Sequence, residues 1–151
     1  MVYALCEVSE VDSVSERSVS EDTNPFAARG FHPSAIIIGV PYIGKGTWIG
    51  AFTLIDGSGG LHIGEGCDIA AGVHIYTHSS ARRCITARAH PEVDRSPVHI
   101  GDYVFIGAQS VVLMGVSIGD RATIGAGSVV TRDVAPGSTV AGNPARLLNG
   151  Q

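Results

Sequence analysis

Most of the side chains that could do chemistry in this sequence lie between positions 74 and 99. Four of the six histidines occur there: His74, His78, His90 and His99. Four arginines follow the second of them: Arg82, Arg83, Arg88 and Arg95. Imidazole exchanges protons near neutral pH and ligates zinc, whereas guanidinium groups pair with phosphate oxygens. The arginines could instead pair with Glu92 and Asp94 of the same stretch.

The sequence on either side of this stretch repeats every six residues. From Ile100 it reads IGDYVF, IGAQSV, VLMGVS, IGDRAT, IGAGSV and VTRDVA, with an aliphatic residue first and usually a small residue second. The same register runs upstream to Phe31, with a slip of two residues at Leu61 and His62. A period of six is too short for a helical solenoid and is typical of a parallel β-helix. We therefore predict an all-β domain over residues 31–151, built from about five triangular coils.

The register also assigns the aliphatic residues to three stacked rows that face inward. The first face contains Ile43, Ile63, Ile100, Ile118 and Pro136. The second face contains Phe31, Ile49, Ile69, Ile106 and Ile124. The third face contains Ile37, Ile55, Ile75, Val112 and Val130. Because a coil can bury its apolar residues only against neighbouring coils, we expect these rows to form the core.

The repeat is interrupted directly after the hexad IYTHSS, which contains His78. The next hexad should open at residue 81, but the register returns at Ile100, so the 19 residues 81–99 form a loop inserted at one corner. Long excursions from a compact scaffold are often functional. His78 takes the fourth position of its hexad, which points outside the coil. Asp56 lies on the same face one coil earlier, with about 8 Å between its backbone and that of His78, from the spacing of strands and the rise along them.

Composition narrows the class of protein further. The net charge of −4 arises in residues 1–30, where six acidic residues face two arginines, whereas residues 31–151 carry eight acidic and eight basic residues. We predict that residues 1–30 are irregular, with a partner-binding or trimer-contacting arm as the alternative. No signal peptide, membrane span or nucleic-acid surface is expected. Three cysteines without metal-site spacing fit a reducing cytoplasm, and Cys67 should simply be buried.

Residues 31–149 resemble the hexapeptide-repeat acyltransferases, most specifically over residues 54–78 and 96–148. Within that family they resemble the sugar O-acetyltransferases related to the maltose, galactoside and bacterial polysaccharide enzymes. The ending VVTRDVAPGSTVAGNPARLL, together with a histidine at the entrance of a long loop, is the most specific part. The resemblance implies a left-handed helix and a homotrimer with active sites between neighbouring prisms. It also implies direct transfer of acetyl from acetyl-CoA to a sugar or polysaccharide-precursor hydroxyl in a bacterial cytoplasm.

The resemblance also suggests roles for individual residues. His78 matches the catalytic histidine and would act as general base. From the register rather than from the resemblance, Asp56 would orient His78, bind an acceptor hydroxyl or cap the DGSGG turn. Many relatives place an acidic residue where this chain has Ser79. On the acceptor side we expect Tyr76, Arg82 and Arg83. The residues expected to bind CoA are Phe105, where many relatives have Trp, and Gly107, Ala108, Gly125, Ala126, Thr131, Arg132 and Arg146.

Other functions remain open at this point. The same type of prism serves γ-class carbonic anhydrases, which hold zinc between subunits with three histidines. His74 and His78 are four residues apart, whereas the local pair in that zinc pattern is five apart, so no metal is expected. An amino-sugar N-acetyltransferase and a noncatalytic prism are the remaining alternatives.

Overall fold

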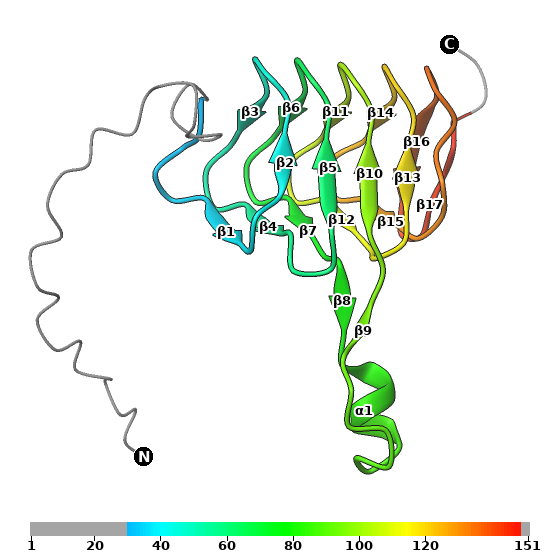
Figure 1. The fold of residues 1–151 in the computed structure, drawn as a ribbon. Helices are drawn as coiled ribbons and strands as arrows, with labels where there is room; N and C mark the ends of the chain where they lie inside the picture. The colour runs from blue at the N-terminus through cyan, green and yellow to red at the C-terminus, as the bar shows by residue number, and fades with distance from the viewer. Residues whose placement is uncertain (1–29, 149–151) are drawn as a thin grey trace, which may run out of the picture.

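The computed structural model is a left-handed parallel β-helix. The six-residue repeat predicts the β-helix, and the family resemblance implies its left hand. The structure describes residues 30–148, so the predicted irregular segment lies outside the described residues apart from its last position. Successive coils stack into a triangular prism, and a narrow stalk leaves one of its edges (Figure 1). The stalk carries α1 (Ala81–Ile85), which is the only helix within residues 30–148.

Each face of the prism is a sheet of short parallel strands. The first face consists of β2 (Tyr42–Ile43), β5 (Leu61–Ile63), β10 (Val98–Ile100) and β13 (Ser117–Ile118). The second consists of β3 (Trp48–Ile49), β6 (Asp68–Ile69), β11 (Phe105–Ile106), β14 (Thr123–Ile124) and β16 (Thr139–Gly142), to which β17 (Ala145–Leu147) adds antiparallel. The third consists of β1 (Ile36–Ile38), β4 (Leu54–Asp56), β7 (His74–Ile75), β12 (Val111–Val112) and β15 (Val129–Val130). In the stalk, β8 (His78–Ser79) pairs antiparallel with β9 (Asp94–Arg95).

The strand register confirms the predicted core. Ile43, Ile63, Ile100 and Ile118 align on the first face, and the second and third rows align as predicted. Nearly all of these side chains are buried, as is Cys67, while Phe31 and Ile37 are partly buried at the open N-terminal end. Burying one such isoleucine contributes roughly 1.5–3 kcal/mol, so the stacked rows are the main source of stability.

Two boundaries of the predicted pattern were wrong. Pro136 is exposed, and Val134 bridges to Ile118 in its place, because the last coil is two residues shorter than the repeat. The inserted loop ends at residue 97 rather than 99, because Val98 and His99 pair with Leu61 and His62 in the adjacent coil. The two residues that disturb the register at positions 61 and 62 therefore have counterparts at 98 and 99.

All departures from the six-residue period lie on one edge of the prism, between the third and first faces, which we call the loop edge. Inward residues there are eight apart from Ile55 to Ile63, twenty-five from Ile75 to Ile100 and four from Val130 to Val134. At the other two edges the spacing is always six. We call the edge between the second and third faces, which carries Gly107, Ala108, Gly125 and Ala126, the glycine edge.

At the two edges with constant six-residue spacing, hydrogen bonds link each coil to the next. At the glycine edge, the turn amides of Gly72, Gln109 and Gly127 donate to carbonyls of the preceding coil at 2.8–3.0 Å. At the edge between the first and second faces, Asp120 Oδ1 accepts the Asp102 amide at 2.9 Å, and Asp102 Oδ1 accepts the Glu65 amide at 2.8 Å. A Cβ at Gly101 would lie 2.1 Å from Asp120 Oδ1, so the small second residue of the hexad makes room for the next carboxylate.

Candidate active site

His78 and Asp56 meet at the base of the stalk. β7 lies beside β4 on the third face, with Ile75 aligned to Ile55, so the chain leaves both strands at the same corner. His78 Nδ1 lies 2.6 Å from Asp56 Oδ2. The imidazole is 37% exposed, whereas the Asp56 side chain is fully buried. The sequence register placed these residues one coil apart, and the structure brings their side chains into contact.

The Asp56 carboxylate is held by its surroundings as well as by His78. The amide of Ser58 donates to Oδ1 and the amide of Thr77 donates to Oδ2, both at 2.9 Å. The Thr77 hydroxyl lies 2.9 Å from Oδ2 and accepts the Gly59 amide at 2.8 Å. Asp56 thus caps the DGSGG turn and contacts the imidazole at the same time. Thr77 was not predicted, although it stands beside His78 at the point where the repeat breaks.

These contacts determine the charge of Asp56 and the proton position on His78. Burial alone would raise the pKa of the Asp56 carboxyl, but hydrogen bonds from Ser58, Thr77 and His78 hold that pKa well below its ordinary value of 3.8. Asp56 is therefore a carboxylate at neutral pH and requires a donor at His78 Nδ1. With the proton on Nδ1, the lone pair of the neutral imidazole lies on Nε2.

Tyr76 lies between two histidines on the outer side of the coil. Its hydroxyl is 3.2 Å from His74 Nδ1. Its ring stands edge-on to His74 and to His78, with centroid distances of 5.9 and 6.5 Å. Tyr76, which was predicted to bind the acceptor substrate, therefore lies beside His78. The His74 ring contacts both the ring and the hydroxyl of Tyr76. The role of Tyr76 in binding an acceptor stays a prediction.

The stalk provides the remaining loop residues. Arg82 Nε lies 3.1 Å from Asp94 Oδ1, and a second guanidinium nitrogen contacts the same oxygen. Arg82 therefore forms an ion pair within the stalk, which is the alternative given above for the loop arginines. Within residues 30–148, Arg83 makes no ion pair. None of the residues of α1 is buried against the rest of the described chain. The helix α1 is therefore largely exposed on the described chain.

The residues predicted to bind CoA lie on two different edges of the prism. Phe105, Gly107, Ala108, Gly125 and Ala126 lie along the strand ends that lead to the glycine edge. Thr131 and Arg132 lie on the loop edge, two coils beyond Thr77, which corresponds to about 10 Å at the spacing of β-strands. A single chain does not bring the two sets together. Gly107 also has a structural reason to be small, because a Cβ there would lie 2.5 Å from the Ala126 amide.

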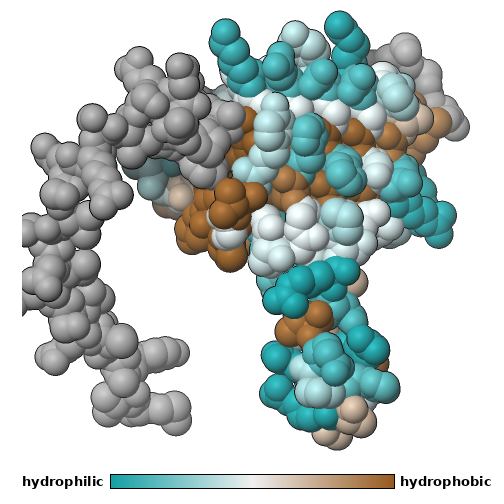
Figure 2. All heavy atoms as spheres, in the orientation of Figure 1, coloured by the Kyte–Doolittle hydropathy of each residue, from teal (hydrophilic) through white to brown (hydrophobic). Residues whose placement is uncertain are grey.

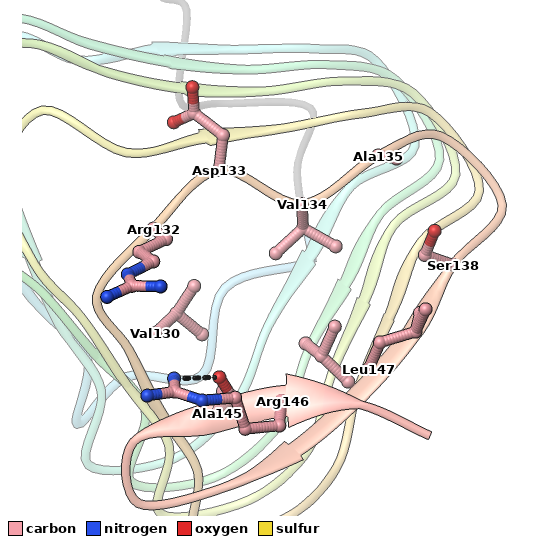
Figure 3. Close-up of a pocket in the computed structure, with 10 residues that line it drawn as sticks. Val130, Arg132, Asp133, Val134, Ala135, Ser138, Ala145, Arg146 and Leu147 are labelled. Carbon is pink, nitrogen blue, oxygen red and sulfur yellow. Dashed lines mark hydrogen bonds between the residues drawn. The ribbon is translucent and has the colours of Figure 1, made fainter. Parts of the chain in front are cut away.

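Arg132 and Arg146 line one hollow at the C-terminal end of the prism (Figure 3). Its floor consists of the last inward residues, Val130, Val134 and Val140. Arg146 Nη1 donates to the Ala145 carbonyl at 2.8 Å, and the carboxylate of Asp133 points away from both guanidinium groups (Figure 3). An apolar floor flanked by two guanidinium groups suits an organic ligand that carries phosphate. The residues present therefore fit the phosphates of CoA.

The fold and the site define a hexapeptide-repeat β-helix with a histidine–aspartate pair at a loop, and comparison with known proteins supports the hexapeptide repeat. The family model described as a hexapeptide repeat of succinyl-transferase matches residues 42–77 and 97–132, on either side of the stalk. The chain is 49% identical over 85 residues to nodulation protein L of Rhizobium meliloti, covering 56% of this chain and 46% of that protein. It is 42% identical over 120 residues to a probable serine acetyltransferase of rice (Oryza sativa), covering 80% of this chain and 34% of that protein. The chain thus spans less than half the length of these two relatives.

Solved structures agree with this assignment. A hexapeptide-repeat acetyltransferase of Vibrio cholerae superposes with a TM-score of 0.73 at 32% identity, covering 80% of this chain and 69% of that chain. Its complex with acetyl coenzyme A gives a TM-score of 0.68 over 81% and 70% of the two chains, also at 32% identity. A galactoside acetyltransferase in complex with coenzyme A gives a TM-score of 0.68 at 30% identity over 80% and 63%. The chain belongs to the hexapeptide-repeat acetyltransferase family.

Residues 30–148 contain no cluster of three or more His, Cys, Asp or Glu side chains arranged to hold a metal ion. The same part of the chain has no helix with the length and apolar character needed to cross a membrane.

Proposed function

We propose that this chain is an acetyl-CoA-dependent O-acetyltransferase that acts on a hydroxyl of a sugar or polysaccharide precursor, in the bacterial cytoplasm. The 2.6 Å contact between His78 Nδ1 and the buried carboxylate of Asp56 carries the proposal. The relatives solved with acetyl coenzyme A and coenzyme A support the donor, and the galactoside acetyltransferase supports a sugar acceptor. The thiols of Cys67 and Cys84 are free, which fits the proposed location.

In this mechanism His78 is the general base. Asp56 holds Nδ1–H, so Nε2 accepts the proton of the acceptor hydroxyl as its oxygen attacks the thioester carbonyl carbon. The new C–O bond forms, the C–S bond breaks, and the imidazolium returns the proton to the departing sulfur. Asp56 stabilises the transient positive charge on His78 without itself taking a proton, because its pKa is held low. Acetyl-CoA would supply the activated acetyl group, with Arg132 and Arg146 holding its phosphates.

The proposal includes a homotrimer, because one face of the prism is suited to contact with copies of the same chain. The outward residues of the third face are Ile36, Leu54, His74, Val111 and Val129. Those of the first face are Tyr42, His62, His99 and Ser117, and those of the second are Trp48, Asp68, Phe105, Thr123 and Thr139. The third face alone is mostly aliphatic, so its burial in an oligomer is favourable.

A threefold arrangement with the third faces turned inward also completes the site. Each prism then contacts its two neighbours through the two edges of that face, so the loop edge of one copy lies against the glycine edge of the next. This places His78 and Arg132 of one copy beside Phe105, Gly107 and Ala108 of a neighbour. The two groups of predicted CoA residues, separate in one chain, would then line one cleft.

Charge placed on the third face tests the trimer. Val111→Glu should dissociate it, because three carboxylates would be buried at the axis. Thr123→Glu, at the equivalent outward position of the second face, should leave it intact. Sedimentation equilibrium distinguishes the two results. A wild-type monomer, or a Val111→Glu protein of unchanged mass, would contradict this assembly.

Calorimetric titration of acetyl-CoA into the purified protein tests the activity first. Micromolar binding near one site per chain is expected, and absence of binding would contradict the proposed donor. With an acceptor from a sugar screen, His78→Ala should lower kcat at least ~10²-fold while acetyl-CoA affinity persists. His90→Ala, which removes another exposed histidine of the stalk, is the matched control. Normal turnover in His78→Ala would remove His78 from the mechanism.

Two other reactions would give distinct results. An amino-sugar N-acetyltransferase would acetylate an amino sugar in preference to its hydroxyl analogue. A zinc hydratase of the γ-carbonic anhydrase type would contain stoichiometric zinc by metal analysis and hydrate carbon dioxide.

A further inference from the structure

A second hollow lies on the outer side of the first face, outside the candidate active site. It is lined by His62, His99, Ser117, Gly119, Asp133 and Pro136. It exists because the last coil is two residues short, so no strand follows β13 on this face. Residues 133–136 cross the open end instead and form a wall.

The polar groups of this hollow are exposed and regularly spaced. The His62 ring stacks on the ring of Tyr42 at a centroid distance of 4.5 Å and an angle of 7°, which fixes its plane. The His99 ring follows one coil further on, 6.3 Å from His62. Asp133 Oδ1 accepts the Ser117 amide at 2.8 Å. Within residues 30–148, no hydrogen bond to Asp133 Oδ2 is found, so this oxygen can accept one from a ligand.

This combination of groups selects a class of ligand. The flat rings of this face offer apolar surface, while imidazole nitrogens, the Ser117 hydroxyl and Asp133 offer hydrogen-bond partners. Figure 2, which views this face, shows hydrophobic surface between hydrophilic side chains along its strands. The negative charge of the Asp133 carboxylate disfavours a ligand that carries a phosphate group. A sugar ring, with one apolar side and a rim of hydroxyls, fits these groups.

We infer that this hollow is a subsite for a sugar unit of an oligosaccharide acceptor, away from the hydroxyl acetylated at His78. The inference rests on the proposed function and makes it more specific. The first face begins where the loop edge ends: His62 follows the DGSGG turn that Asp56 opens, and His99 follows the end of the stalk. Tyr42, His62 and His99 succeed one another at about 4.8 Å, the spacing of strands, which is comparable to the length of one hexose unit. A chain held at His78 can therefore extend along this face.

Dependence on chain length is the test. Acetyl transfer would be measured with maltose-series, galactose-series and N-acetylglucosamine-series acceptors of two to six units. In at least one series kcat/KM should rise at least about tenfold between two and four units, since two or three added hydrogen bonds and ring contacts supply that factor. In a His62→Ala/His99→Ala variant this ratio should fall to within about twofold of unity. Asp68→Ala, which removes the equivalent outward side chain of the second face, should retain it.

The outcomes separate the subsite from the proposed activity. Equal kcat/KM for short and long acceptors, or an unchanged ratio in the double variant, would overturn the subsite while the activity stands. If no series is acetylated, binding of the same oligosaccharides is measured by nuclear magnetic resonance. Binding that strengthens with length and requires His62 and His99 would support the subsite, and its absence would overturn it. Failure to bind acetyl-CoA would overturn the proposed activity alone.

Discussion

Asp56→Asn tests the histidine–aspartate pair through both stability and turnover. In the wild type, Oδ1 accepts from Ser58 and Oδ2 accepts from Thr77 and His78. An asparagine has only one oxygen, so one of these donors must face an amide NH₂ group in either orientation of the side chain. Losing a hydrogen bond to a charged group costs about 1.5–3 kcal/mol, and we expect a loss of about 2–3 kcal/mol at pH 7. Turnover should fall on the order of 10²-fold, because the Nδ1–H of His78 loses its acceptor.

The stability loss should depend on pH in a defined direction. The pKa of Asp56 is lowered in the folded state, so its stabilising effect is complete above the unfolded value of 3.8 and is lost as pH falls below it. Between pH 6 and pH 3 the difference in free energy of unfolding between wild type and variant should shrink by about 1 kcal/mol. Urea unfolding across this range measures it, with the exposed Asp68→Asn as control. A difference that stays constant down to pH 3 would refute a low-pKa Asp56.

Two further predictions concern the coil ladder and the donor site. Asp120→Ala should lower the free energy of unfolding by about 0.5–1.5 kcal/mol, because the Asp102 amide loses its acceptor. Asp120→Asn keeps an oxygen at this position, so its free energy of unfolding should stay close to that of the wild type. Urea unfolding measures both values. Arg132→Ala and Arg146→Ala should each weaken acetyl-CoA binding about tenfold by calorimetry, with Lys45→Ala as an exposed control. Unchanged affinity for acetyl-CoA in both arginine variants would contradict the assignment of the C-terminal hollow to CoA binding.

The coils could be predicted from the sequence because each six-residue unit buries one aliphatic side chain in a fixed place. The same rule misplaced the last coil, since Pro136 keeps the register while the structure shortens the turn and buries Val134. The register also placed Asp56 near His78, but it carries no information on side-chain direction. The buried hydroxyl of Thr77, which holds that carboxylate, was therefore missed.

Other features depended on contacts between coils rather than on the period. In the sequence, the ladder of Asp102 and Asp120 appears only as IGD at the start of two hexads. The two carboxylates accept backbone amides that are 37 and 18 residues away in the chain, and the six-residue period does not reveal these contacts. The hollow around His62 and His99 requires the short last coil, which the period does not reveal. The separation of the CoA residues onto two edges follows from the register and indicates how a second copy would complete the site.

The loop edge should tolerate inserted residues that the glycine edge does not. At the glycine edge the Gly127 amide donates to the Ala108 carbonyl at 2.8 Å as part of a ladder, whereas no partner is found for the Gly115 amide at the loop edge within the described coils. Two glycines inserted after Gly115 add little loop-closure entropy and break no such bond. The same insertion after Gly127 breaks the ladder, at about 0.5–1.5 kcal/mol for each hydrogen bond, and disturbs the glycine edge.

Thermal unfolding followed by circular dichroism should therefore show a larger fall in midpoint for the insertion after Gly127. Equal falls would mean that both edges resist extra residues alike. In that case the irregular spacing at the loop edge would need a functional origin, because the coil itself would give no reason for it. If the falls differ as expected, the prism accepts insertions along this one edge, and the stalk, the DGSGG turn and the shortened last coil are three uses of the same structural freedom.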